Sequence, residues 1–167
     1  MTIYWIDSSV LIQSRHKYHT KERVPQFWSW LDGKLDSGVI QMPHRAYREV
    51  TAGNDWLVKW CKDRRDRGLD VSSSAEVQSA YRQLVAHVEH KYRHAQHQIR
   101  EFQRGADGWV IAHAKATRGI AVSEEDRARK NATSSIKIPN LCREIQPRVR
   151  WLDTFGMLDE LEADFSR

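Results

Sequence analysis

Four acidic residues stand where strands are expected to end or helices to begin. Asp7 follows directly on the apolar run of residues 3–6, and Asp107 begins an apolar helical pattern. Glu49 lies on the helix expected after a second strand, and Glu125 follows a third strand. Positions just beyond the ends of parallel strands share one edge of a sheet. The four carboxylates are therefore predicted to converge at that edge.

Carboxylates that converge need a positive charge between them. Like charges a few ångströms apart raise one another's pKa, and a divalent cation removes that cost. Ligand sets made only of oxygen select Mg²⁺ or Mn²⁺ rather than zinc. Asp7, Asp107 and Glu125 are the predicted metal ligands, and Glu49 would complete the site or orient an attacking water. A cation held in this way can polarise a phosphate and activate a nucleophile.

Each acid also has a purely structural interpretation. Asp7 could be the N-cap of a helical turn, because aspartate is a good N-cap. Asp107 could stabilise the positive end of a helix dipole. Glu49 could be a solvated helix residue, and residues 124–126 could be a plain acidic turn. The joint pattern of four acids is more specific than any one of them.

Strand and helix patterns alternate along the chain, which predicts a single α/β domain over residues 1–167 with a mainly parallel sheet flanked by helices. Apolar residues recur at spacings of three and four over residues 74–104 and predict one long helix there. This helix would end a helical insertion spanning about residues 55–104, between the second and third strands. Strands are expected at residues 2–7, 39–42, 120–122 and 150–152.

The long helical pattern also carries a stripe of four histidines. Histidines at positions i and i+4 can share a zinc ion. A solvated, weakly basic surface is the favoured interpretation, because only Glu101 accompanies the stripe at ligand spacing and the stripe lies away from the apolar face. Its members are His87, His90, His94 and His97.

The chain has a formal net charge of +5 and a pI near 9.4, a balance that favours polyanionic partners. Five of its 27 Lys and Arg residues lie close together in residues 59–67, where they are predicted to contact RNA phosphates. A charged helix face with nothing bound is the alternative. The candidate RNA-binding residues are Lys59, Lys62, Arg64, Arg65 and Arg67.

Several protein classes are disfavoured by composition. No segment approaches the roughly 18 uncharged apolar residues of a membrane span, and the N-terminus lacks the pattern of a secretory signal. Cys61 and Cys142 are the only cysteines, too few for a disulfide framework. The expected location is the cytoplasm, with no membrane partner.

Together these motifs resemble the PIN-domain nucleases, and in particular the VapC-type toxins of bacterial and archaeal toxin–antitoxin pairs. The resemblance runs in order over residues 2–126 and implies a PIN-like three-layer fold. It is closest to a larger-bodied subgroup. The motifs that carry it are Tyr4-Trp5-Ile6-Asp7-Ser8-Ser9-Val10, Glu49, Ala106-Asp107-Gly108-Trp109-Val110-Ile111-Ala112-His113-Ala114 and Val122-Ser123-Glu124-Glu125.

The resemblance implies a metal-dependent endoribonuclease that uses Mg²⁺ or Mn²⁺ and leaves a 5′-phosphate and a 3′-hydroxyl. Asp7, Glu49 and Asp107 match family positions directly. The family's fourth acid usually follows a threonine by two places, whereas here Ser123 precedes Glu125. Glu124 and Asp126 remain alternatives for that acid.

Two further residues support the predicted site through the resemblance. Ser9 matches a hydroxyl that supports the family's site, and Asn140 would be an extra neutral ligand. RNA as substrate, a cognate antitoxin and a homodimer are the implied partners. The alternative function is a catalytically weak PIN-like module that acts by binding RNA or protein.

Overall fold

The computed structural model describes residues 1–125 and 136–166. In this part of the chain four strands form one sheet, in the order β2-β1-β3-β4, and every neighbouring pair is parallel. Tyr4 pairs with Ile40 on one side and with Ile120 on the other. The strands are β1 (Tyr4–Ile6), β2 (Ile40–Gln41), β3 (Ile120–Val122) and β4 (Arg150–Leu152).

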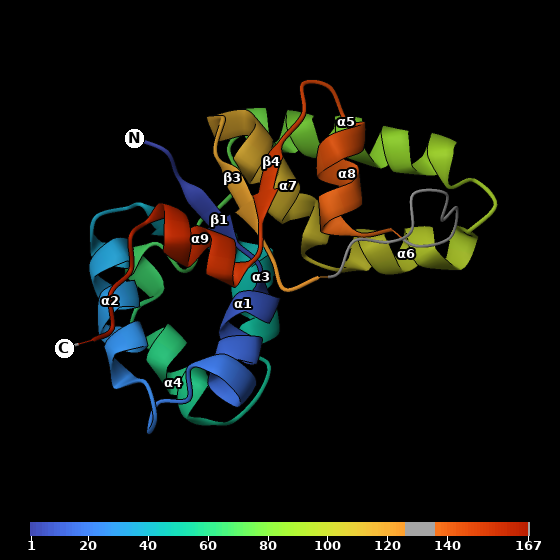
Figure 1. Ribbon diagram of the computed structural model, residues 1–167. Helices are drawn as coiled ribbons and strands as arrows, with labels where there is room; N and C mark the ends of the chain where they lie inside the picture. The colour runs from blue at the N-terminus through green and yellow to red at the C-terminus, as the bar shows by residue number, and fades with distance from the viewer. Residues whose placement is uncertain (126–135, 167) are drawn as a thin grey trace.

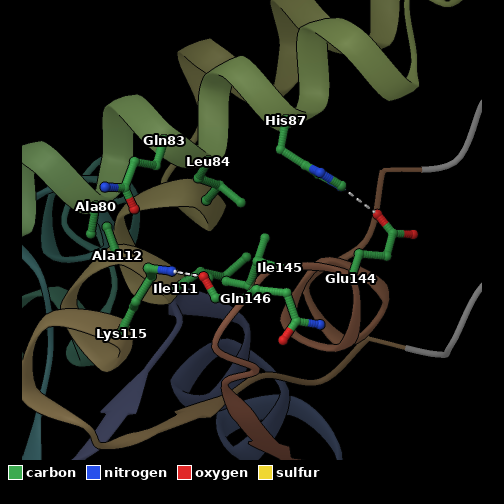
Figure 2. Close-up of a pocket in the computed structure, with 10 residues that line it drawn as sticks. All are labelled: Ala80, Gln83, Leu84, His87, Ile111, Ala112, Lys115, Glu144, Ile145 and Gln146. Carbon is green, nitrogen blue, oxygen red and sulfur yellow. Dashed lines mark hydrogen bonds and ion pairs between the residues drawn. The ribbon is translucent and has the colours of Figure 1, made fainter.

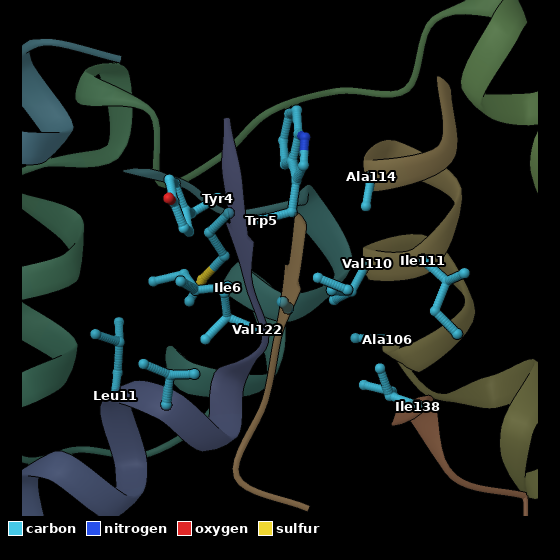
Figure 3. Close-up of a cluster of buried hydrophobic side chains, with 14 of the residues drawn as sticks. Tyr4, Trp5, Ile6, Leu11, Ala106, Val110, Ile111, Ala114, Val122 and Ile138 are labelled. Atoms are coloured by element: carbon cyan, nitrogen blue, oxygen red, sulfur yellow. The ribbon is translucent and has the colours of Figure 1, made fainter. Parts of the chain in front are cut away.

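The two central strands are fully buried. All three residues of β1 and all three of β3 are buried, as expected for parallel strands covered on both faces. Figure 3 shows Val110 and Ile111 of α7 (Asp107–Thr117) packed on one side of these strands and Leu11 of α1 (Ser8–Gln13) on the other. Burial on both faces explains why the apolar runs in the sequence are continuous rather than alternating.

Helices cover both faces of the sheet (Figure 1). In that view α5, α7 and α8 lie to the right of the strands, and α2 and α9 lie to the left. The predicted three-layer α/β architecture with a parallel sheet is confirmed. These helices are α2 (Pro25–Asp36), α5 (Ala75–Lys91), α7 (Asp107–Thr117), α8 (Ile138–Glu144) and α9 (Thr154–Glu160).

The segment between β2 and β3 is helical, as expected, but the prediction of one helix over residues 74–104 is wrong. The helix breaks at residues 92–95, between α5 and α6. A straight continuation would carry the apolar face of α6 beyond the core, whereas the turn brings Ile99 and Phe102 back into it. The remaining insertion elements are α4 (Trp56–Lys62), the short 3₁₀ helix η2 (Arg65–Arg67) and α6 (Gln96–Arg104).

Three shorter helices complete the described fold around the carboxyl ends of β1 and β2. One of them is a single turn of π-helix. None of the described helices has both the length and the apolar composition of a membrane span. The three helices are α1 (Ser8–Gln13), the π-helix η1 (Ser14–Tyr18) and α3 (His44–Val50).

Candidate functional site

Asp7 lies where β1 leaves the sheet. Its backbone N–H donates to Val122 O of β3 at 2.9 Å, and its Oδ2 accepts from the backbone N–H of Ser9 at 3.2 Å. Asp7 is therefore the N-cap of α1, as its structural interpretation proposed. The second oxygen, Oδ1, is buried and has no hydrogen-bond partner within residues 1–125 and 136–166. Capping thus uses only half of a carboxylate that is 4 % exposed.

Glu49 joins two helix starts that are far apart in the sequence. Its Oε2 accepts from Ser8 Oγ at 2.7 Å, and its Oε1 accepts from the backbone N–H of Ala106 at 3.0 Å. Ser8 follows Asp7, and Ala106 precedes Asp107. Glu49 therefore fixes the beginnings of α1 and α7 beside each other. A glutamate that was merely solvated would not make these contacts.

Asp107, the first residue of α7, carries the clearest electrostatic sign of convergence. Burial, and then the negative charges of Asp7, Glu125 and Glu49, raise the pKa of Asp107 to about 8. Burial and Glu49 likewise raise the pKa of Asp7, and burial and Asp7 raise the pKa of Glu125. Carboxylates influence one another in this way only at close range. The structure thus brings together the four predicted acids, here called the carboxylate cluster: Asp7, Glu49, Asp107 and Glu125.

The residues after β3 separate into different roles. Glu125 Oε2 accepts from the backbone N–H of Ile138 at 2.8 Å, which places Glu125 between the cluster and the start of α8. Glu124 Oε1 accepts instead from the backbone N–H of Thr154, at 2.9 Å, so this carboxylate supports the start of α9. Glu125 is the better candidate for the fourth acid on this geometry. Asp126, the remaining alternative, lies outside the described residues.

The two supporting residues lie next to the same chain segments. Ser9 Oγ accepts from the backbone N–H of Glu124 at 3.0 Å, which ties α1 to the end of β3. Asn140 is buried at 5 % exposure on α8, in the helix whose first backbone N–H binds Glu125. Ser9 therefore positions the strand end.

A divalent cation fits the chemistry of the cluster. A nearby cation would give the unpartnered Oδ1 of Asp7 a partner to bind. It would also lower the raised pKa of Asp107. Across the described chain, however, no three His, Cys, Asp or Glu side chains are arranged as a ready metal-binding group. Mg²⁺ often takes only one or two carboxylates and keeps several waters. A site of that kind would need no more than two of the cluster carboxylates, for example Asp7 and Asp107.

An open groove of about 630 Å³ lies beside Glu49. Its basic side chains are Arg45 and Arg48 of α3 and Arg104 at the end of α6. Among the described residues Arg45 and Arg48 make no ion pair, and Arg104 makes an exposed one with Glu101 at 3.1 Å. We call this feature the arginine groove. The sequence signal for it was the spacing of Arg45 and Arg48, one helical turn apart on the helix of Glu49, and our sequence analysis missed it.

The predicted RNA-binding stretch, residues 59–67, is largely neutralised by its own neighbours. Arg67 Nε lies 2.6 Å from Asp36 Oδ1, and Arg64 Nη2 lies 2.8 Å from Asp32 Oδ2. Lys62 makes no ion pair within the described chain. The other two pairs are Arg65 with Asp70 at 2.5 Å and Lys59 with Asp63 at 2.8 Å.

The four-histidine stripe does not form, because the helix break separates its members. His87 and His90 lie on α5, His94 lies in the turn and His97 lies on α6. His87 Nε2 instead contacts Glu144 Oε2 at 3.0 Å. The zinc interpretation, already disfavoured from the sequence, has no geometric support among the residues described.

His87 borders a separate cavity of about 270 Å³ between α5, α7 and the end of α8 (Figure 2). Leu84, Ile111 and Ile145 form apolar parts of its wall. Its ionisable groups already have partners, since Lys115 donates to Gln146 O at 2.6 Å and His87 contacts Glu144. The carboxylate cluster, with its unpartnered oxygen, is the stronger candidate for chemistry.

Comparison with known proteins gives a family but no activity. No curated protein matches this sequence. Among solved structures, the crystal structure of PAE2754 from Pyrobaculum aerophilum is similar at 11% sequence identity, with a TM-score of 0.47 over 98% of this chain and 91% of that one. Residues 4–165 match the family described as "Domain of unknown function (DUF4411)". The chain therefore belongs to the DUF4411 family.

Proposed function

We propose that this protein is a metal-dependent endoribonuclease and the toxin of a toxin–antitoxin pair. The observation that carries the proposal is the meeting of Asp7, Glu49, Asp107 and Glu125 at one sheet edge, with Asp7 Oδ1 buried and unpartnered. Parallel sheets bind their ligands at this edge. The resemblance of these acids and their flanking residues to PIN-domain nucleases, in the order of the chain, supports the same activity.

Asp7 and Asp107 would hold Mg²⁺ or Mn²⁺, and Glu125, whose charge acts on Asp107, would join them through a bound water. When bound, the cation would polarise the scissile phosphate and stabilise the charge that develops on it. Ser9 keeps the end of β3 in place through its contact with Glu124. Asn140 of α8 would add a neutral oxygen ligand for the cation.

Glu49 would orient the attacking water. Both of its oxygens are held by donors, Ser8 Oγ and the backbone N–H of Ala106, while the residue remains exposed toward the arginine groove. The water oxygen attacks phosphorus as its proton passes to a carboxylate. The bond from phosphorus to the 3′-oxygen breaks, and that oxygen takes a proton from solvent. The products are a 5′-phosphate and a 3′-hydroxyl.

The arginine groove would hold the RNA backbone. Arg45, Arg48 and Arg104 lie next to Glu49, and their charges are less neutralised than those of residues 59–67. Phosphate contacts of this kind give affinity without sequence information. This assignment moves the proposed backbone contact from the stretch expected from the sequence to α3 and the end of α6.

The proposed biological setting also follows from the resemblance. A cognate antitoxin would neutralise the nuclease, homodimers are usual in the family, and the cytoplasm is where RNA and antitoxin would meet it.

The test is cleavage of labelled RNA by the purified full-length chain with Mn²⁺ or Mg²⁺. We expect cleavage that EDTA stops and that Asp7→Asn and Asp107→Asn each reduce to background. Asp63→Asn, the matched control, removes a carboxylate that pairs with exposed Lys59 and should leave cleavage intact. Equal cleavage by wild type and Asp7→Asn would identify a contaminating nuclease and contradict the proposal.

A binding module without turnover is the second candidate. The absence of a ready three-ligand metal group among the described residues favours it. It predicts RNA or antitoxin binding that survives Asp107→Asn, and no cleavage with either metal.

A further inference from the structure

Two exposed aromatic rings lie together near the carboxylate cluster. Tyr18 is 43% exposed and Phe155 is 46% exposed, whereas nearly all other large apolar side chains described are at least partly buried. Their ring centroids lie 5.1 Å apart, with the planes at 75°. Tyr18 ends the π-helix η1, and Phe155 is the second residue of α9. Two distant segments thus place an exposed ring at the same point.

Buried residues of the core hold the two exposed rings in place. His19, buried at 7 % exposure, has its ring 6.4 Å from Tyr18 and 6.0 Å from Phe155. His19 stacks on Phe27 of α2 at 4.2 Å, and its backbone carbonyl accepts from Trp28 Nε1 at 2.7 Å. The exposed rings therefore stand on fixed neighbours, which lowers the entropy that is lost when a ligand binds them.

The rings line a second groove, of about 510 Å³, that reaches the cluster. Glu125 belongs to both, just as Glu49 belongs to both the cluster and the arginine groove. The carboxylates of Glu124, Glu125 and Asp153 make this groove unfavourable for a phosphate, and Lys17 is its single basic side chain among the residues that line it. An uncharged, flat group suits this groove better. We call it the aromatic groove.

We propose that Tyr18 and Phe155 bind an unpaired nucleobase of the RNA strand whose phosphate lies at the carboxylate cluster. This inference rests on the proposed function and adds to it a base-binding subsite, formed by two exposed rings beside the carboxylate cluster. A base in a duplex has its faces covered by its neighbours, whereas an unpaired base can stack on a protein ring. With phosphates in the arginine groove and a base in the aromatic groove, the strand crosses the cluster between Glu49 and Glu125.

The experiment measures binding separately from cleavage. The full chain carrying Asp107→Asn is titrated, without metal, into fluorescently labelled single-stranded RNA and into a duplex of the same sequence, and anisotropy is recorded. Tyr18→Leu and Phe155→Leu should each weaken single-strand binding about tenfold, since one base–aromatic stack contributes on that order. Tyr18→Phe keeps the ring and should bind as the parent does.

The matched control is Trp30→Leu, which removes a half-buried aromatic ring that packs on Phe27 and Phe165. It should leave RNA affinity unchanged. Independently of any variant, single-stranded RNA containing 5-iodouracil should crosslink under ultraviolet light to a peptide that contains Tyr18 or Phe155. This second measurement does not depend on how well the leucine variants fold.

The outcomes separate the two proposals. Cleavage by wild type combined with unchanged binding in both leucine variants would overturn the base-binding proposal alone. Absence of cleavage combined with ring-dependent RNA binding would overturn the nuclease and leave the base-binding site standing. Equal affinity for duplex and single strand, or no RNA binding, would overturn base stacking. So would altered self-association with unchanged RNA affinity, which would identify the rings as a protein interface.

Discussion

A buried histidine on α7 shows how a single residue adjusts to the interior of this fold. His113 is 2 % exposed, lies against the ring of Trp5 at 4.3 Å, and has Ser73 Oγ 3.4 Å from its Nε2. Burial lowers the pKa of His113 to about 4. The imidazole is therefore neutral in the folded protein at neutral pH.

This histidine gives a prediction for stability at acid pH. The pKa of His113 in the unfolded chain is about 6.5, above its folded value, so the unfolded state binds the proton more tightly. The stabilisation from His113 is complete above pH 6.5 and is lost as the pH falls toward 4. Compared with His113→Gln, wild type should lose about 2 kcal/mol of unfolding free energy between pH 7 and pH 5.

Urea unfolding of both proteins at the two pH values measures this difference. The comparison with the variant is needed because burial also lowers the pKa of His19 and raises those of the cluster acids. Those groups titrate in both proteins, so their contributions to the pH dependence of stability cancel in the comparison. A difference between the proteins that is the same at pH 7 and pH 5 would show that His113 does not control this loss.

At the residue scale, the positions of the four acids could be predicted from the sequence better than the contacts that they make. Asp7 and Asp107 stand at boundaries that local apolar patterns mark, so their placement could be inferred. The hydrogen bonds that Glu49 makes to Ser8 and to Ala106 join residues 41 and 57 positions apart. No local pattern specifies such contacts, because they depend on how separate helices pack.

At the scale of elements, the strands were predictable and the helix ends were not. Continuous apolar runs identify strands buried on both faces, and β1 and β3 lie where such runs were expected. The edge strand β4 also lies at its expected residues, although it is only partly buried. The break between α5 and α6 was missed because the apolar spacing continues through residues 92–95 without a proline or glycine. Burial of Ile99 and Phe102 decides that turn, and burial is a property of the packed molecule.

The connection from α7 to β3 gives a prediction about an element boundary. A Cβ at Gly119 would lie 2.4 Å from Ile3 O, and that oxygen cannot retreat freely because it accepts from the backbone N–H of Ile120 at 2.9 Å. Gly119→Ala should therefore lower the free energy of unfolding by about 1–3 kcal/mol.

Gly33 provides the opposite case and the control. It lies exposed inside α2, and a Cβ there would meet nothing within 4 Å. Gly33→Ala should raise the free energy of unfolding by about 0.5–1 kcal/mol, because alanine loses less backbone entropy in a helix. Chemical denaturation of the two variants tests both signs. Destabilisation of equal size in both would mean that the close approach at Gly119 does not decide the outcome.

At the scale of the whole molecule, the stretch of sequence with the most basic residues is not the described surface with the most unpaired positive charge. The net charge is +5, and the densest basic stretch, residues 59–67, lies against Asp32, Asp36 and Asp70. Ion pairs of this kind cancel most of the field that a polyanion would feel. Arg45 and Arg48 of α3 are far in the sequence from Arg104 of α6, yet the three border one groove.

This redistribution predicts which arginines set the salt dependence of RNA binding. Each phosphate contact that is lost should reduce the slope of log affinity against log salt by about 0.7 for a single strand. Arg48→Gln should reduce the slope by this amount and weaken binding to all sequences. Arg67→Gln, the control of equal charge change, removes an arginine that already pairs with Asp36 and should leave the slope nearly unchanged.

Anisotropy titrations of labelled single-stranded RNA at 50 to 200 mM salt, a range over which phosphate contacts change affinity by orders of magnitude, measure both slopes. Arg45→Gln should behave as Arg48→Gln does, since the two lie one turn apart on α3 and neither makes an ion pair in the described part of the chain. A lower slope for Arg67→Gln with an unchanged slope for Arg48→Gln would show that residues 59–67, and not α3, contact the RNA backbone. In that case the strand would approach Glu49 from α4, and the path across the two grooves would be wrong.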